Sequence, residues 1–372
     1  MRPGMKVERG RLPALDWLRF AAALGVLAYH YVSSYLPDDP GSRWLEYAAH
    51  VTRYGYLGVE LFFIISGFVI LWSAQGKSAA SFAVSRFARL YPAFWAAMLL
   101  TSACYLLLGP YAPQVSGQEV SLHRLLANAT MMPQLFDAER IDGVYWTLEL
   151  EIRFYFLVFV LLLLRQMGNT ERWLYLWLAL SAWISLQGAP RWVEYFAVAP
   201  YGSFFIGGCL LYLIRSSGWS WPRAAALAVA VVLAATDSIR IRSGFISADM
   251  ESAWVVPLLV VLLFGVLLVL LATPRRSGEP APESGFSYQL GALTYPLYLT
   301  HAAIGRMLIE ILLPHVGAAA AVLLASACAI AIAWILVVLV DEPARKPVSR
   351  LLYRGLDSAG STLTAILRPG KP

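Results

Sequence analysis

Charged side chains are scarce in this chain: Asp, Glu, Lys and Arg make up only 14% of its 372 residues. A typical soluble domain carries about 25%, so the composition excludes an ordinary soluble globular protein. Apolar residues reach 59%, and apolar runs of about 20 residues, long enough to cross a bilayer, recur along the chain. The composition therefore predicts an all-α, polytopic transmembrane helical bundle.

Cysteine is also scarce, and each of the 3 cysteines, Cys104, Cys209 and Cys328, lies in an apolar run. This spacing excludes a disulfide framework and gives no ligand set, so we expect no metal site. A small-residue cleavage pattern is missing after the first apolar stretch, which Arg19 and His30 interrupt. We therefore expect a retained first helix rather than a signal peptide.

About ten apolar segments are expected to span the membrane. They run over 13–36, 55–74, 91–109, 143–164, 172–187, 199–214, 223–237, 253–273, 286–313 and 316–340. We expect one membrane domain over 1–345. The basic tail 346–372 is expected to be cytoplasmic and to lie on the inner lipid surface.

The positions of Lys and Arg predict the orientation of the chain in the membrane. With the N-terminus inside, most basic residues outside the spans fall in cytoplasmic segments, as the positive-inside rule requires. Both termini are therefore expected in the cytoplasm of a multi-pass protein of the inner (plasma) membrane. Topology accounts for the net charge of +6, so no nucleic-acid partner is expected.

Arg19 and His30 lie inside the first span, where an ionisable group costs on the order of 2.5–3.5 kcal/mol. They are separated by about 16 Å along a helix and by about 20° around it, so they share one face. Snorkelling would explain Arg19 alone, and an interhelical hydrogen bond would explain His30 alone. Because Arg19 and His30 lie on one face, together they predict a polar track through the membrane.

Further polar residues fall within other spans. Glu60 and Ser66 belong to the second span, and Tyr298 and His301 to the ninth, where His301 is also compatible with plain packing. In the fourth span, Glu149 and Arg153 are spaced to pair, which leaves Glu151 as the freer carboxylate. Charges at such depth indicate a protein interior or a wet cavity, although a purely structural ion-pair network stays open.

Arg86 and Arg89 precede the third span and share a helix face on the expected cytoplasmic side. Two guanidinium groups at this spacing suit phosphate recognition, because each forms a bidentate fork. Topology and contact with lipid headgroups explain them equally well.

Six motifs in this order resemble the acyltransferase family 3 of membrane O-acyltransferases. They are "LDWLRFAA" with ten residues between Arg19 and His30, "GVELFFIISGF", "SRFARLYP", "WTLELEIRFYF", "LTYPLYLTH" and "DEPARK". The resemblance implies transfer of an acyl group, most often acetyl, from cytoplasmic acyl-CoA to a hydroxyl. The implied acceptor is an exopolysaccharide or another cell-surface glycan or lipid-linked sugar.

The resemblance also implies roles for particular residues. Arg19 and His30 match the family's essential pair, and Arg86 and Arg89 match its inner-loop arginines. We expect catalysis by His30 as general base, because an imidazole titrates near neutral pH, with Glu60 or Glu151 orienting its ring. Arg19 and Ser66 are also expected in the catalytic group. We expect the acyl-CoA co-substrate to contact Arg19, Arg86 and Arg89. The expected contacts of the acceptor or the oxyanion are Trp146, Tyr298, Tyr155 and Glu149.

Two alternatives stay open at this point. A two-step route through acyl-His30 or acyl-Ser66 is compatible with the same residues. A proton-coupled transporter would also use buried Glu, His and Arg, although the sequence has no inverted repeat. No tightly bound cofactor is expected, and the sequence does not identify the acceptor or the oligomeric state.

Overall fold

A computed structural model describes residues 12–36, 42–115, 119–247, 249–272 and 285–366. Most of these residues are helical and none forms a β-strand, as the composition predicts. The α-helices are α1 (Pro13–Ala28), α2 (Arg43–Thr52), α3 (Gly58–Ala74), α4 (Ala79–Leu108), α5 (Leu122–Ala129), α6 (Trp146–Leu163), α7 (Thr170–Gln187), α8 (Arg191–Ala197), α9 (Gly202–Ser217), α10 (Trp221–Ile241), α11 (Met250–Ala272), α12 (Phe286–Val316), α13 (Ala318–Leu336) and α14 (Glu342–Ile366).

Seven helical stretches in the described part of the chain are long and apolar enough to cross a membrane. They contain α3, α4, α9, α10, α11, α12 and α13. The other three expected spans correspond to α1, α6 and α7, which are helical but are not among these seven stretches, and α6 carries three charged residues. The fold is thus a multi-pass helical bundle, while the count of ten spans and the cytoplasmic termini stay predictions.

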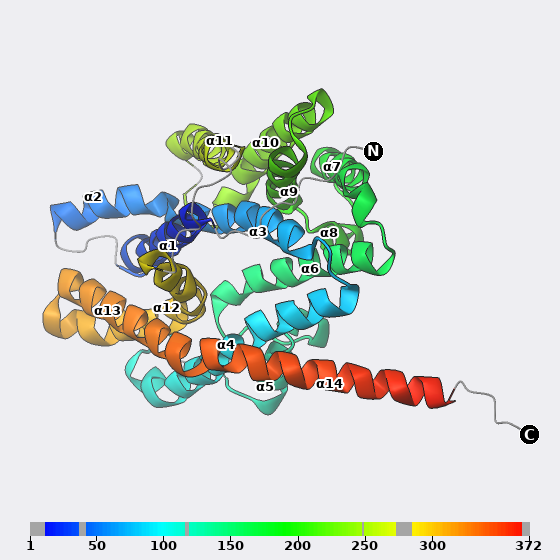
Figure 1. The fold of residues 1–372 in the computed structure, drawn as a ribbon. Helices are drawn as coiled ribbons and strands as arrows, with labels where there is room; N and C mark the ends of the chain where they lie inside the picture. The colour runs from blue at the N-terminus through cyan, green and yellow to red at the C-terminus, as the bar shows by residue number, and fades with distance from the viewer. Residues whose placement is uncertain (1–11, 37–41, 116–118, 248, 273–284, 367–372) are drawn as a thin grey trace, which may run out of the picture.

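Helices α1, α3 and α12 lie at the centre of the bundle (Figure 1). Helix α1 packs against both α3 and α12, α3 packs against α9, and α12 packs against α13. Helices α9, α10 and α11 form one side of the bundle, and α4, α5 and α14 lie on the opposite side (Figure 1). The polar residues of α1 therefore face other helices rather than the surroundings of the bundle.

Two π-helical segments interrupt this regular pattern. The first, Tyr29–Ser34, follows α1 and contains His30, whose carbonyl oxygen accepts from the backbone N–H of Tyr35. The second, Val337–Asp341, joins α13 to α14 and ends on a fully buried aspartate. Such segments add a residue to a helical turn and re-aim its side chains, often at functional sites.

Helix α4 begins at Ala79, earlier than the span predicted from residue 91. The side chain of Ser78 caps it by accepting from the backbone N–H of Ser81 at 3.1 Å. Arg86 and Arg89 are therefore part of the helix itself. The predicted boundary between residues 345 and 346 falls inside α14, and residues 1–11 and 367–372 lie outside the described residues.

Helices α3 and α9 approach each other closely through glycine. A Cβ on Gly208 would lie 1.9 Å from the carbonyl oxygen of Ile64, and one on Gly67 would lie 2.2 Å from that of Phe205. Small residues allow such close backbone approach between membrane helices. Gly67 thus holds α9 near α3, next to Ser66, which faces a cavity.

The substitution Gly208→Ala is expected to destabilise the protein by about 1–3 kcal/mol, because the added methyl group forces two backbones apart. Thermal unfolding of the protein in detergent measures this effect. Gly265→Ala in α11 is the matched control, since a Cβ there meets nothing within 4 Å. An equal loss of stability in both variants would contradict the packing argument.

Candidate active site

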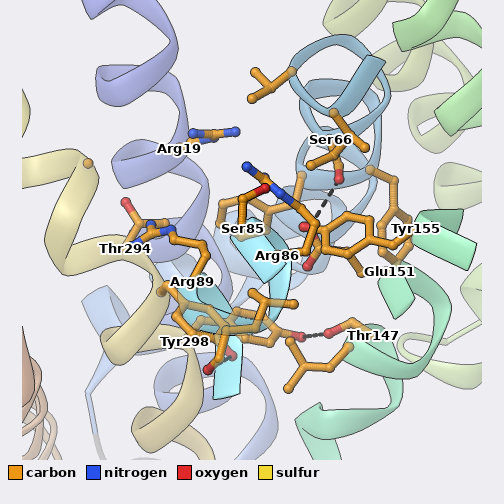
Figure 2. A pocket seen from close by; sticks show the side chains of 18 of the residues that line it. Arg19, Ser66, Ser85, Arg86, Arg89, Thr147, Glu151, Tyr155, Thr294 and Tyr298 are labelled. Carbon is orange, nitrogen blue, oxygen red and sulfur yellow. Dashed lines mark hydrogen bonds between the residues drawn. The ribbon is translucent and has the colours of Figure 1, made fainter. Parts of the chain in front are cut away.

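A cavity of about 400 Å³ lies between α1, α3, α4, α6, α12 and α14. We call it the arginine cavity, because Arg19, Arg86, Arg89 and Arg345 all line it. Figure 2 shows three of these side chains around it, with Thr147 and Tyr298 joined at one end. A smaller cavity of about 280 Å³ adjoins it and shares Arg19, Arg89 and Arg345. The charge of this region is predominantly positive.

Ser66 and Tyr155 both bind Glu151 in the arginine cavity. The Ser66 hydroxyl donates to Oε1 of Glu151 at 3.0 Å, and the Tyr155 hydroxyl donates to the same oxygen at 2.6 Å (Figure 2). The sequence placed Glu151 as the freer carboxylate of α6, and the structure sets it within this three-residue network. Two hydroxyl donors help to offset the cost of a carboxylate among membrane helices.

The four arginines differ in how they are held. Arg89 donates to the buried Asp341 at 3.0 Å, and Arg345 pairs with the same carboxylate. Among the described residues, Arg19 and Arg86 form no ion pair, and Nε of Arg86 is buried without a hydrogen-bond partner. Arg19 and Arg86 are therefore the guanidinium groups most ready to receive an anion.

A second cavity, of about 370 Å³, contains His30 and is called the histidine cavity. Its wall is strongly aromatic, and Asp142, Gln114 and Arg306 supply further polar groups. The Asp142 carboxylate accepts from the backbone N–H groups of Val144 and Ala303 at 3.1 and 3.0 Å, which ties the loop between α5 and α6 to α12. The aromatic residues are Tyr29, Tyr35, Tyr56, Tyr105, Trp146, Phe245 and Tyr298.

The two cavities meet at a thin wall. Val59 of α3 and Tyr298 of α12 line both of them. The Tyr298 hydroxyl accepts from Thr147 Oγ1 at 2.8 Å and donates to the Val144 carbonyl at 3.2 Å. Arg19 and His30 thus lie on opposite sides of this wall, at the two ends of the face that the sequence predicts on the first helix.

His30 is held by a second histidine and not by a carboxylate. Its Nδ1 lies 3.1 Å from Nε2 of His301 and 3.0 Å from the carbonyl oxygen of Val26. Glu151 lies in the arginine cavity, and Glu60 is buried but lines neither of these cavities. The expectation that Glu60 or Glu151 orients the His30 ring is therefore wrong, since His301 from α12 occupies that place.

Glu149 is enclosed by two arginines. Its carboxylate accepts from Arg140 at 2.9 Å, and Arg153 pairs with it as the spacing predicts. The carboxylate is fully buried, and Arg153 stacks on the ring of Tyr195 at 3.6 Å. Glu149 thus joins the loop between α5 and α6 to α6, and it lines neither large cavity, so the structure does not place it as the expected acceptor contact.

The substitution Glu149→Gln is expected to lower the stability of the fold by about 3 kcal/mol, because it leaves two partly buried guanidinium groups without their counter-ion. Thermal unfolding in detergent measures the loss. Glu139→Gln, in the same loop but with an exposed side chain, should leave stability unchanged. If both variants unfold alike, the ion-pair cluster does not hold the loop.

Sequence reasoning missed three residues of this region. Asp142 precedes a span and so reads as a loop residue, yet it is only 1% exposed. Asp341 lies in "DEPARK", a motif in which no site residue was expected. His301 was compatible with plain packing, and only the fold shows its ring against His30.

The fold and this buried polar site define the class: a polytopic membrane protein with a polar site enclosed by its helices. The family model described as "Acyltransferase domain" matches residues 12–338. The chain therefore belongs to this acyltransferase family.

Two curated relatives are similar to parts of the chain. "Acyltransferase MdmB" of Streptomyces mycarofaciens is 32% identical over 149 residues, which cover 39% of this chain and 38% of the relative. "Protein 2 in picA locus" of Rhizobium radiobacter is 33% identical over 123 residues, which cover 31% of this chain and 56% of the relative. Both alignments thus span less than two thirds of the relative's length. No solved structure matches the chain.

Proposed function

We propose that the protein moves an acetyl or other short acyl group from cytoplasmic acyl-CoA to a hydroxyl of an exopolysaccharide or other cell-surface glycan, in the inner (plasma) membrane. The observation that carries this proposal is the pair of cavities on either side of Val59 and Tyr298. One offers cationic groups for a phosphorylated donor, and the other offers an imidazole for a hydroxyl acceptor.

In this proposal the donor occupies the arginine cavity. Arg86 binds a phosphate of coenzyme A, because its guanidinium group has no anionic partner in the described structure. Arg19 binds a second phosphate or the pantetheine arm, while Arg89 stays paired with Asp341. The arm then runs past Ser66, Glu151 and Tyr155 to the wall at Tyr298.

The acceptor occupies the histidine cavity, where aromatic rings offer faces for a sugar. His30 takes the proton of the attacking hydroxyl, and the hydroxyl oxygen bonds to the thioester carbon. The C–S bond of the resulting tetrahedral intermediate breaks, and the departing thiolate receives the proton from His30. Tyr298 and Trp146 are the proposed contacts of the oxyanion and the acceptor.

The test is a thiol-release assay with the purified protein in detergent or liposomes. Given radiolabelled acetyl-CoA and a preparation of cell-surface glycans, it should release coenzyme A and label the glycan. A proton-coupled transporter would release none, and that result would overturn the proposal. Label trapped on His30 or Ser66 without acceptor would select the two-step route over direct attack.

A further inference from the structure

The carbonyl oxygens around the two histidines determine where their protons lie. Nδ1 of His301 lies 2.9 Å from the carbonyl oxygen of Tyr298 and 3.2 Å from that of Leu297. A carbonyl oxygen only accepts, so these contacts require the proton of neutral His301 on Nδ1. Its Nε2 then carries a lone pair and faces Nδ1 of His30.

The same reasoning applies independently to His30. Its Nδ1 lies 3.0 Å from the carbonyl oxygen of Val26, so this nitrogen carries the proton of the neutral ring. The proton on His30 Nδ1 and the lone pair on His301 Nε2 are complementary across 3.1 Å. Two separate sets of carbonyl contacts therefore give one consistent arrangement of protons.

Neighbouring groups hold the two rings in this geometry. The Tyr31 hydroxyl donates to the backbone carbonyl of His301 at 2.8 Å, which links the segment after α1 to α12. Gly305 makes room for this contact, because a Cβ there would lie 2.0 Å from the Tyr31 hydroxyl. His301 is 1% exposed and lines neither large cavity, whereas His30 lines the histidine cavity.

We infer that His301 is a positioning residue that, together with the Val26 carbonyl, fixes the tautomer of His30, so that Nε2 of His30 is the nitrogen that accepts the proton of the acceptor hydroxyl. This inference rests on the proposed acyl transfer and names the partner of its base. A neutral imidazole has a single lone-pair nitrogen, and the wrong tautomer would present an N–H to the hydroxyl. After proton uptake, the Nδ1–H of His30 still donates to His301 Nε2, which stabilises the imidazolium.

Two amide substitutions of His301 each preserve one of its two contacts, either the one with His30 or the one with the backbone carbonyls. In His301→Gln the amide oxygen reaches the former position of Nε2 and still accepts from His30. In His301→Asn the amide N–H replaces the Nδ1 contact with the carbonyls, but the side chain ends short of His30. We expect His301→Asn to lower kcat about 100-fold or more with little change in KM for acyl-CoA, and His301→Gln to stay within about tenfold of the wild type. Equal kcat values in the two variants would overturn the inference.

The wild-type protein provides a second measurement that does not depend on the folding of a variant. Bromoacetyl-CoA alkylates the nitrogen that carries a lone pair, with loss of bromide, and hydrolysis leaves a carboxymethylhistidine whose Nδ1 and Nε2 isomers separate by chromatography. The inference predicts the Nε2 isomer at His30, and the Nδ1 isomer would overturn it. Failure of the proposed function is distinguishable, because the wild type would then release no coenzyme A to any acceptor.

Discussion

Replacement of His30 by alanine is expected to lower the rate of acyl transfer by about 100- to 10,000-fold, the range supplied by a positioned general base. The residue lines the histidine cavity, and no other imidazole lines either large cavity in the described part of the chain. Initial rates of thiol release at saturating donor measure the effect. Binding of acyl-CoA, measured separately, should persist because the donor contacts lie across the wall.

The control for this substitution is His123→Ala, whose side chain is exposed on α5 outside both cavities. That variant should transfer at the wild-type rate. If His30→Ala retained near-normal transfer, the assignment of His30 as the base would fail.

The substitution Arg86→Ala is expected to weaken binding of acyl-CoA about 10- to 100-fold. A hydrogen bond to a charged group contributes about 1.5–3 kcal/mol, and each 1.4 kcal/mol is about tenfold in affinity. Arg86 is suited to this role because its Nε is buried without a partner. Titration of acyl-CoA against the purified variant measures the change in Kd.

A phosphate-free donor makes this test specific. Acyl-pantetheine lacks the phosphates, so wild type and Arg86→Ala should bind it equally if Arg86 contacts a phosphate. Arg89→Ala gives the contrast, because Arg89 neutralises the buried Asp341 and its loss should lower thermal stability instead. A loss of affinity in Arg86→Ala that is the same for both donors would contradict the phosphate contact.

The helices of the bundle were predictable because their signals are local. Apolar runs of membrane length and the shared face of Arg19 and His30 follow from composition and from helix periodicity alone. The membrane span was predicted from residue 91 because Arg86 and Arg89 lower the hydropathy before it, whereas the helix itself begins at Ala79. Both residues belong to α4 and line the arginine cavity.

The pairing within the site was not predictable, because it joins residues far apart in the chain. His301 meets His30 across 271 positions, and Asp341 meets Arg89 across 252. No spacing rule for a single helix connects such pairs. Glu60 was one of the two expected partners of the His30 ring, yet it is buried and lines neither of these cavities.

The central claim is that a donor bound among the arginines meets His30 across the wall of Val59 and Tyr298. An experimental structure with a non-hydrolysable acyl-CoA analogue tests it most directly. The account predicts the phosphates at Arg86 and Arg19 and the acyl carbonyl at Tyr298, within reach of Nε2 of His30. Phosphates bound in the histidine cavity, or an acyl group that ends in the arginine cavity away from Tyr298, would contradict it.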